Sequence, residues 1–398
     1  MKNVFCFAFL IKKLLLVSFF VLNYIYCTAQ YEFTKSVVVD SIAIDNGESF
    51  ALYLPSSYNK DEPSPIIFVF DPAARGTTGL TPFLDVSEKH NYIVVCSNNS
   101  KNGPLEQNFE IANRLFNYVF SNYSIEESNM LVAGFSGGSR LATTIAVLTN
   151  KFSGVIACGA GFSSVPSHTP STQDFSYVGI CGNEDMNYNE MLKNKGFLQR
   201  LNFSSTLFTY NGDHKWPPNE QINRAFRWLQ NKKIKDSVLI SQNFELDFNE
   251  AEAFYSSGEL LFSAEVYDRI LASYKGFVPL NEVNEKYSSL INSKAYKKEH
   301  KSLQDALAQE EKISIKLFDK LNGDFLFPKK VNFSWWKKEL NKLEKLNADG
   351  SFQLKKMVSR IRFNLFAAVY SRKNARLHNS SSEQISLSNK LQKLIYPN

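Results

Sequence analysis

A serine between glycines, Gly134-Phe135-Ser136-Gly137-Gly138, is the clearest chemical feature of this sequence. The apolar run Met130–Ala133 before it favours a strand, and Ser139–Leu148 after it favours a helix. A serine at the apex of such a turn is held in a strained backbone conformation, and the glycines let strand and helix pass closely. The helix N-terminus directs N–H groups towards a reacting oxygen. We predict Ser136 as a nucleophile; the alternative is a glycine-rich turn with an N-capping serine.

A serine hydroxyl is a weak nucleophile and needs a positioned base. The candidates are the five histidines His90, His168, His214, His300 and His378. Only His214 directly follows a predicted strand, Thr206–Tyr210, at the sheet edge where catalytic groups of parallel sheets gather. It also obeys the chain order serine, acid, histidine. We therefore predict His214 as the base, with a surface-loop histidine as the alternative.

The acid that orients the histidine is expected in the loop after the preceding strand, Tyr177–Cys181. That loop reads Gly182-Asn183-Glu184-Asp185, and we predict Asp185 as the acid with Glu184 as its rival. Asp213 adjoins His214 in the sequence and is poorly directed towards the imidazole ring. An acidic turn without a catalytic role has the same composition and remains the alternative.

An oxyanion hole requires two backbone donors. The first is predicted to be the N–H of Gly137, directly after the nucleophile. The second is expected from the loop after Ile66–Phe70, which reads Asp71-Pro72-Ala73-Ala74-Arg75-Gly76. Because proline has no N–H, Ala73 is the predicted second donor.

Composition excludes several classes of protein. The chain has 398 residues with 44% hydrophobic and 14% aromatic residues, which suffices for about two domains with large cores. Its net charge of +6 is spread out rather than gathered in a basic stripe, so no nucleic-acid partner is expected. Without a CxxC motif or a His/Cys cluster, we predict no metal, and the predicted chemistry requires no cofactor.

Residues 1–29 have the pattern of a secretory signal peptide, with lysines before an apolar stretch, Leu14–Ile25. The small residues Cys27-Thr28-Ala29 offer a cleavage site before Gln30. We predict a secreted or periplasmic protein without a stable membrane span after cleavage. An uncleaved anchor is the alternative.

Three cysteines, Cys96, Cys158 and Cys181, remain after removal of that segment. An odd number gives no complete disulfide framework. Each lies in an apolar, strand-like run, so we predict buried free thiols.

Strand-like and helix-like segments alternate through residues 30–234, which we predict to be one domain. The expected strands are Ser36–Ile44, Phe50–Leu54, Ile66–Phe70, Tyr92–Cys96, Met130–Phe135, Gly154–Ala160, Tyr177–Cys181 and Thr206–Tyr210. Amphipathic segments near 81–90, 105–120, 138–149, 187–201 and 218–230 are expected to be helices. Two early strands followed by this alternation predict an α/β fold with a mostly parallel sheet between layers of helices.

Residues 235–398 change to helical spacing of Leu, Lys, Glu and Ala, which predicts an all-helical second domain. The stretch Gly258–Leu271 resembles part of a tetratricopeptide helix pair. Trp335-Trp336 and the apolar run Phe363–Tyr370 are predicted to be core. This domain could cap a site, bind a protein partner or only stabilise the sheet domain.

Together these residues resemble the α/β-hydrolase superfamily, and within it the secreted esterases related to polyhydroxybutyrate depolymerases and feruloyl esterases. The resemblance covers roughly residues 35–231 and rests on Leu52-Tyr53-Leu54-Pro55-Ser56-Ser57-Tyr58, Phe68-Val69-Phe70-Asp71-Pro72, Gly134-Phe135-Ser136-Gly137-Gly138-Ser139-Arg140, Gly182-Asn183-Glu184-Asp185 and His214-Lys215-Trp216-Pro217. It implies a triad of Ser136, Asp185 and His214. Asp71 stands where the family usually has histidine, which is a departure in the oxyanion loop.

The expected activity is hydrolysis of a carboxylic ester, in a small molecule or a polymer, through an acyl-enzyme on Ser136. Two other functions remain open. A peptidase would use the same residues on an amide, and a non-catalytic binding protein would keep the fold alone.

Overall fold

The computed structural model describes residues 34–233, 236–375 and 381–397. The predicted signal segment 1–29, the predicted domain boundary at 234/235 and His378 lie outside these ranges. Within them, no helix is both long and apolar enough to cross a lipid bilayer.

Eight strands form one sheet in the order β1-β2-β4-β3-β5-β6-β7-β8. Their bounds are β1 Val38–Ile44, β2 Glu48–Tyr53, β3 Ser64–Phe70, β4 Ile93–Ser97, β5 Ile125–Phe135, β6 Gly154–Cys158, β7 Ser176–Gly182 and β8 Ser205–Tyr210. Strand β2 pairs antiparallel with β1 and with β4. The pairs β3–β4, β3–β5 and β7–β8 are parallel, which confirms the predicted mostly parallel sheet.

The first compact unit of the chain runs to Val155 and adds Ser163–Thr169 and Gln173–Phe175. Its helices are α2 Gly76–Leu80, α3 Leu84–His90, α4 Leu105–Asn122 and α5 Gly137–Thr149. All seven residues of β3 are buried, as expected for a parallel strand covered on both faces. Helix α4 buries Ile111, Leu115 and Val119, which recur every four residues and give it one apolar face.

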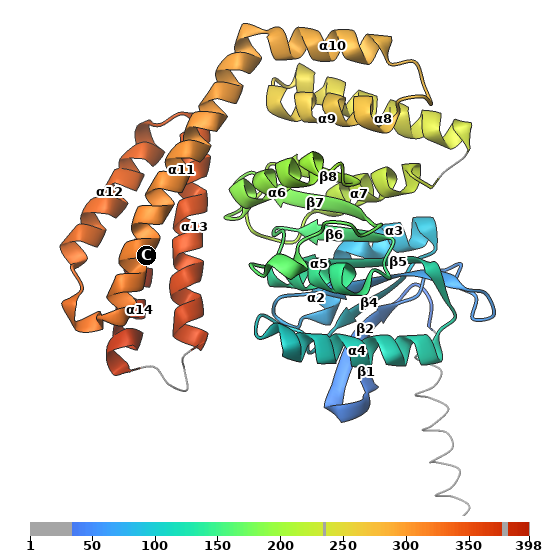
Figure 1. Cartoon of the computed structure of the whole chain (residues 1–398), viewed down its shortest axis with the longest axis horizontal. Helices are drawn as coiled ribbons and strands as arrows, with labels where there is room; N and C mark the ends of the chain where they lie inside the picture. Colours follow the sequence, from blue (N-terminus) through green and yellow to red (C-terminus); the bar gives the residue numbers. More distant parts are fainter. Residues whose placement is uncertain (1–33, 234–235, 376–380, 398) are drawn as a thin grey trace, which may run out of the picture. The chain divides into compact units, whose positions relative to one another are not determined.

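The second unit holds most of β6, then β7 and β8, and continues through the C-terminal helices (Figure 1). Its helices are α6 Tyr188–Arg200, α7 Asn219–Asn231, α8 Ser237–Ser256, α9 Leu260–Ser273, α10 Asn281–Asn292, α11 Lys294–Leu326, α12 Phe333–Asp349, α13 Phe352–Ala375 and α14 Ser382–Ile395. The prediction of an all-helical C-terminal region is thereby confirmed for the described residues. In the described chain, the boundary between the two units falls at β6, inside the sheet.

The C-terminal helices pack around two apolar cores. One lies among α8, α9 and α10 and includes Val266, Tyr267 and Ile270. The other lies among α11 to α14 and centres on Trp336, which is fully buried. Gly258 adopts a φ of +79° in the turn between α8 and α9, a conformation that glycine tolerates best. The resemblance of this helix pair to a tetratricopeptide unit stays a prediction.

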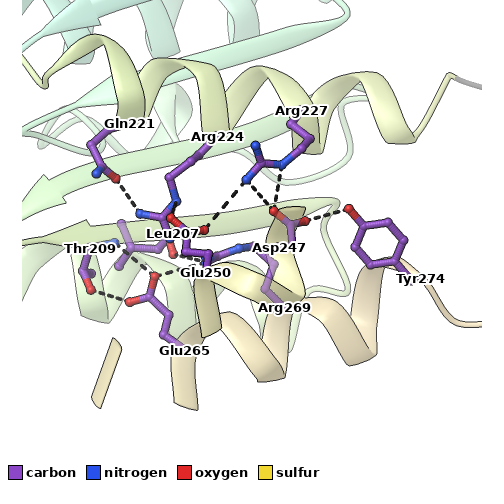
Figure 2. A network of polar contacts seen from close by, with 10 residues as sticks. All are labelled: Leu207, Thr209, Gln221, Arg224, Arg227, Asp247, Glu250, Glu265, Arg269 and Tyr274. Carbon is purple, nitrogen blue, oxygen red and sulfur yellow. Dashed lines mark hydrogen bonds and ion pairs between the residues drawn. The ribbon is translucent and has the colours of Figure 1, made fainter. Parts of the chain in front are cut away.

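A network of buried charges joins strand β8 and helix α7 to helices α8 and α9 (Figure 2). Arg224 of α7 lies 2.8 Å from Glu250 of α8, and Arg227 lies 2.6 Å from Asp247. Burial lowers the pKa of Arg224 and raises that of Glu250, because desolvation disfavours both charges. Each charge is tolerated there only with its partner, so the network fixes how these helices pack on the strand.

The long helix α11 also packs against the sheet. Its residues Leu303 and Leu307 form one apolar cluster with Cys181 of β7 and Leu207 of β8. The three cysteines of the described chain are buried free thiols, as predicted. Burial raises the thiol pKa of Cys96, Cys158 and Cys181, so these groups stay protonated and unreactive.

Candidate active site

Ser136 stands between the end of β5 and the start of α5, as the sequence predicts. Its backbone has φ 53° and ψ −119°, a strained combination for a residue with a Cβ atom. The Ser136 carbonyl accepts hydrogen bonds from Ser139 N–H and Arg140 N–H in the first turn of α5. Ser136 occupies the N-cap position of α5, but its side chain makes no capping hydrogen bond.

The glycines around Ser136 are required by close backbone contacts. A Cβ atom on Gly134 would come within 2.3 Å of the Gly138 carbonyl, and one on Gly138 within 2.0 Å of the Phe70 oxygen. Helix α5 therefore touches both β5 and β3 at its first turn. At Gly137 a Cβ atom would meet the side chain of Asn102 at 1.8 Å, so an amide group packs directly on the residue after the serine.

The loop after β3 is organised by Asp71, whose side chain is fully buried. Its carboxylate accepts hydrogen bonds from Ala73 N–H at 2.8 Å and from the Arg75 guanidinium at 2.9 and 3.0 Å. The predicted oxyanion donor Ala73 N–H is thus occupied by Asp71. Asp71 builds a local ion pair that shapes this loop and raises the pKa of Arg75.

Asp185 and His214 form a close pair in the second unit. His214 Nδ1 lies 2.8 Å from Asp185 Oδ2, and the two side chains are only 9% and 1% exposed. The other carboxylate oxygen accepts Asn187 N–H at 2.8 Å, so Asp185 is held at both oxygens. Because a carboxylate accepts the bond from Nδ1–H, Nε2 of His214 is left as the basic nitrogen. Burial raises the pKa of Asp185, and the bond to His214 opposes that rise.

The loops that carry this pair are bonded to each other. Asn183 N–H donates to Tyr210 O, and Glu184 N–H donates to Gly212 O, both at 2.9 Å. A Cβ atom on Gly182 would meet Gly212 O at 2.2 Å, so the two loops are in backbone contact. The loop after β7 and the loop after β8 therefore form a single support for Asp185 and His214.

The rival residues lie elsewhere in the described chain. Glu184 is one residue before Asp185 and contributes its N–H to the loop contact, while Asp213 is exposed and pairs with Lys215 at 2.9 Å. His168 lies against Phe109, and His300 stacks on Tyr296 in α11. None of these side chains is part of the pair formed by Asp185 and His214.

Sequence reasoning missed the contacts of helix α13 with Asn183 and His214. Phe363 was predicted to be core with Leu365 and Val369, which are fully buried. Phe363 instead packs on the His214 ring, with ring centroids 5.6 Å apart. Arg360, one turn earlier, donates to Asn183 O at 2.7 Å. Arg360 precedes the apolar run Phe363–Tyr370 in the sequence, and no local pattern marks it as a partner of Asn183.

No cluster of three or more His, Cys, Asp or Glu side chains suited to a metal ion occurs among the described residues.

No protein-family model and no curated protein matches this chain. Solved structures similar to it include the S-formylglutathione hydrolase of Staphylococcus aureus, at 17% identity over 48% of this chain and 95% of that one, with a TM-score of 0.41. A feruloyl esterase module of Clostridium thermocellum shows 16% identity over 47% and 84%, with a TM-score of 0.40. An esterase of Pyrobaculum calidifontis shows 14% identity over 48% and 81%, with a TM-score of 0.38.

The molecule's own geometry defines its fold. The sheet is mostly parallel, a strained serine stands between β5 and α5, and the paired side chains of Asp185 and His214 follow β7 and β8. This chain has the α/β-hydrolase fold, with an all-helical C-terminal region added to it.

Proposed function

We propose that the protein is a serine hydrolase that cleaves carboxylic esters with Ser136 as nucleophile, His214 as base and Asp185 as orienting acid. The observation that carries this proposal is the strained backbone of Ser136 at a strand-to-helix turn. Such strain is costly and is kept where a side chain must be presented for chemistry. The buried pair of Asp185 and His214 supports it, since it supplies the base that a serine requires.

In this mechanism His214 Nε2 removes the proton of the Ser136 hydroxyl as its oxygen attacks the ester carbonyl. The tetrahedral intermediate collapses to an acyl-enzyme, and the same imidazolium protonates the departing alcohol. Water, deprotonated by His214, then releases the acid and restores Ser136. Asp185 keeps the proton on Nδ1 and stabilises the imidazolium that forms in each half-reaction.

Gly137 N–H, at the first turn of α5, is the proposed first oxyanion donor. Because Ala73 N–H already donates to Asp71, we propose the Asn102 side-chain amide as the second donor. This amide packs on Gly137, and side-chain amides serve as oxyanion donors in other hydrolases. Replacing Asn102 by alanine should then lower kcat about 100-fold with little change in KM.

The proposal is tested by hydrolysis of short- and long-chain p-nitrophenyl esters by the wild type and by Ser136→Ala. We expect turnover by the wild type and its loss in the variant. Full activity in the variant on every ester cleaved by the wild type would reject Ser136 as nucleophile. The secreted or periplasmic location predicted from residues 1–29 is proposed with this activity and is tested by cell fractionation.

One observation favours a second candidate, a non-catalytic binding protein with a hydrolase fold. The bond from Ala73 N–H to Asp71 removes a backbone donor from the oxyanion loop. Fluorophosphonates separate the two functions, because they react only with an activated serine. A binding protein would stay unlabelled, whereas the proposed hydrolase is labelled on Ser136.

A further inference from the structure

Three residues of helix α13 face the loops that carry the acid and the base. Lys356, Arg360 and Phe363 are spaced by four and three residues, so they share one face of the helix. Lys356 Nζ donates to Asn211 Oδ1 at 3.0 Å, Arg360 contacts Asn183, and Phe363 contacts His214. One helical face thus reaches both loops of the proposed site.

Arg360 is 1% exposed and is held in a fixed position from the opposite side. Its Nε and Nη2 donate to Glu310 of α11 at 2.9 and 2.5 Å, and its guanidinium lies 5.2 Å from the ring centroid of Tyr188. Nη1 donates to the backbone oxygen of Asn183 at 2.7 Å. Since a guanidinium is planar and its donors have fixed directions, the ion pair with Glu310 sets where the Asn183 carbonyl is held.

The position of Asn183 bears on the proposed catalysis. Asn183 lies two residues before Asp185, and its side chain donates to Asn211 Oδ1 at 2.8 Å. Arg360 therefore acts on a loop that is bonded both to the acid and to the segment leading to His214. Small displacements of a catalytic group are costly, because about 1 Å of misplacement lowers rates about 100-fold.

Phe363 is half-buried and its ring is tilted by 46° to the imidazole of His214. In the proposed mechanism His214 delivers a proton to the departing alcohol, so that alcohol must pass next to the imidazole. The Phe363 ring then presents an apolar, aromatic surface near the leaving group. Aromatic leaving groups gain contact area there that small alkyl groups lack.

We propose that helix α13 completes the active site, with Arg360 as a positioning residue for the acid loop and Phe363 as a specificity residue that contacts the leaving alcohol. The inference rests on the proposed ester hydrolysis and extends it to the C-terminal helices. It makes these helices part of the catalytic apparatus rather than an accessory to it.

The positioning role is tested with Arg360→Met in the full chain. Arg362→Met is the matched control, because Arg362 lies on the same helix and pairs with Glu344 of α12 instead. We expect Arg360→Met to lower kcat on p-nitrophenyl acetate about 10- to 100-fold with KM unchanged. The rate of fluorophosphonate labelling should fall by a similar factor, while Arg362→Met matches the wild type in both assays.

If Arg360→Met does not fold, Glu310→Gln keeps the shape of the partner and removes only its charge. We then expect the same fall in kcat at unchanged KM, of smaller size. A folded Arg360→Met or Glu310→Gln with wild-type kcat and labelling rate would overturn the positioning role.

The specificity role is tested with Phe363→Leu and Phe363→Ala on phenyl and ethyl esters of the same acid. We expect the preference of kcat/KM for the phenyl ester to fall at least about 5-fold in Phe363→Ala and less in Phe363→Leu. An unchanged preference in both folded variants would overturn this role.

The controls also separate failure of this inference from failure of the proposed function. A wild type that fluorophosphonate does not label would reject the serine hydrolase, and the inference with it. A labelled wild type whose α13 variants behave like Arg362→Met would reject the inference alone.

Discussion

The turn around Ser136 and the pair of Asp185 and His214 are held in place in different ways. At the turn, the backbone is fixed by neighbours in the sequence and by glycines whose missing side chains let α5 touch β3 and β5. The pair of Asp185 and His214 is supported by a side chain from far along the chain, since Arg360 holds the carbonyl of Asn183, 177 positions away.

This difference explains why the pentapeptide Gly134–Gly138 identifies the serine turn, whereas no comparable short motif identifies the supports of Asp185 and His214. Several residues close to the serine in the sequence must be glycines, because only glycine avoids the steric clashes at this sharp turn. By contrast, the residues of the Asn183 loop do not indicate that a distant arginine holds its carbonyl.

The largest expected effect comes from removing the acid without disturbing the serine turn. Asp185→Asn should lower kcat about 10,000-fold, because the amide favours the wrong tautomer of His214. KM on p-nitrophenyl esters should change little. Retention of more than a tenth of the wild-type kcat would show that Asp185 is not the orienting acid, and Glu184→Gln is the matched control.

The next prediction concerns the ion pairs between α7 and α8. Arg224→Met removes the 2.8 Å partner of Glu250 and leaves it only Arg227 at 3.8 Å, so it should lower the free energy of unfolding by about 3 kcal/mol. Arg200→Met, at an exposed site ending α6, is the control and should stay within about 0.5 kcal/mol of the wild type. Urea unfolding measures both; equal stability of the two variants would mean that the network in Figure 2 does not hold the helices.

A substitution at the Ser136 turn tests its close backbone packing. Gly138→Ala places a Cβ atom within 2.0 Å of the Phe70 carbonyl and should cost about 3 kcal/mol, since backbone atoms must move apart. Gly103→Ala is the control, because its Cβ atom would lie 3.8 Å from the nearest backbone atom. Thermal unfolding distinguishes them. A Gly138→Ala protein as stable as Gly103→Ala would contradict the close approach of α5 and β3.

The smallest expected effect is a dependence of stability on pH. Burial lowers the pKa of Lys356 from 10.5 to about 8, although Glu184, Glu259 and Glu299 oppose this. Between pH 8 and 10.5 the unfolded chain therefore binds more protons at this residue than the folded chain, so folding stability gains with pH. From pH 8 to pH 10.5, the free energy of unfolding of the wild type should rise by about 2 kcal/mol relative to that of Lys356→Met, as measured by urea unfolding at each pH. A difference that is constant with pH would contradict the lowered pKa.

Much of the fold could be predicted because its signals are local. Apolar runs mark all eight strands to within a few residues, although β5 begins at Ile125, before the predicted Met130. Its first residues include the polar Glu126, Glu127 and Ser128, so this part of the strand has no apolar pattern by which it could be predicted.

The chemistry of the oxyanion loop and the role of α13 could not be predicted in the same way. Ala73 was chosen because Pro72 lacks an N–H, but whether an N–H is free depends on the buried carboxylate of Asp71. Phe363 belongs to an apolar helical stripe in which Leu365 and Val369 are core while Tyr370 is exposed, and only the three-dimensional packing separates these cases.

The most direct test of the central claim is labelling of the purified protein with a fluorophosphonate probe, followed by mass spectrometry of the modified peptide. The account predicts a single modification on Ser136, absent from Ser136→Ala and strongly slowed in Asp185→Asn. An unmodified wild type, or a Ser136→Ala protein labelled as fast as the wild type, would contradict it.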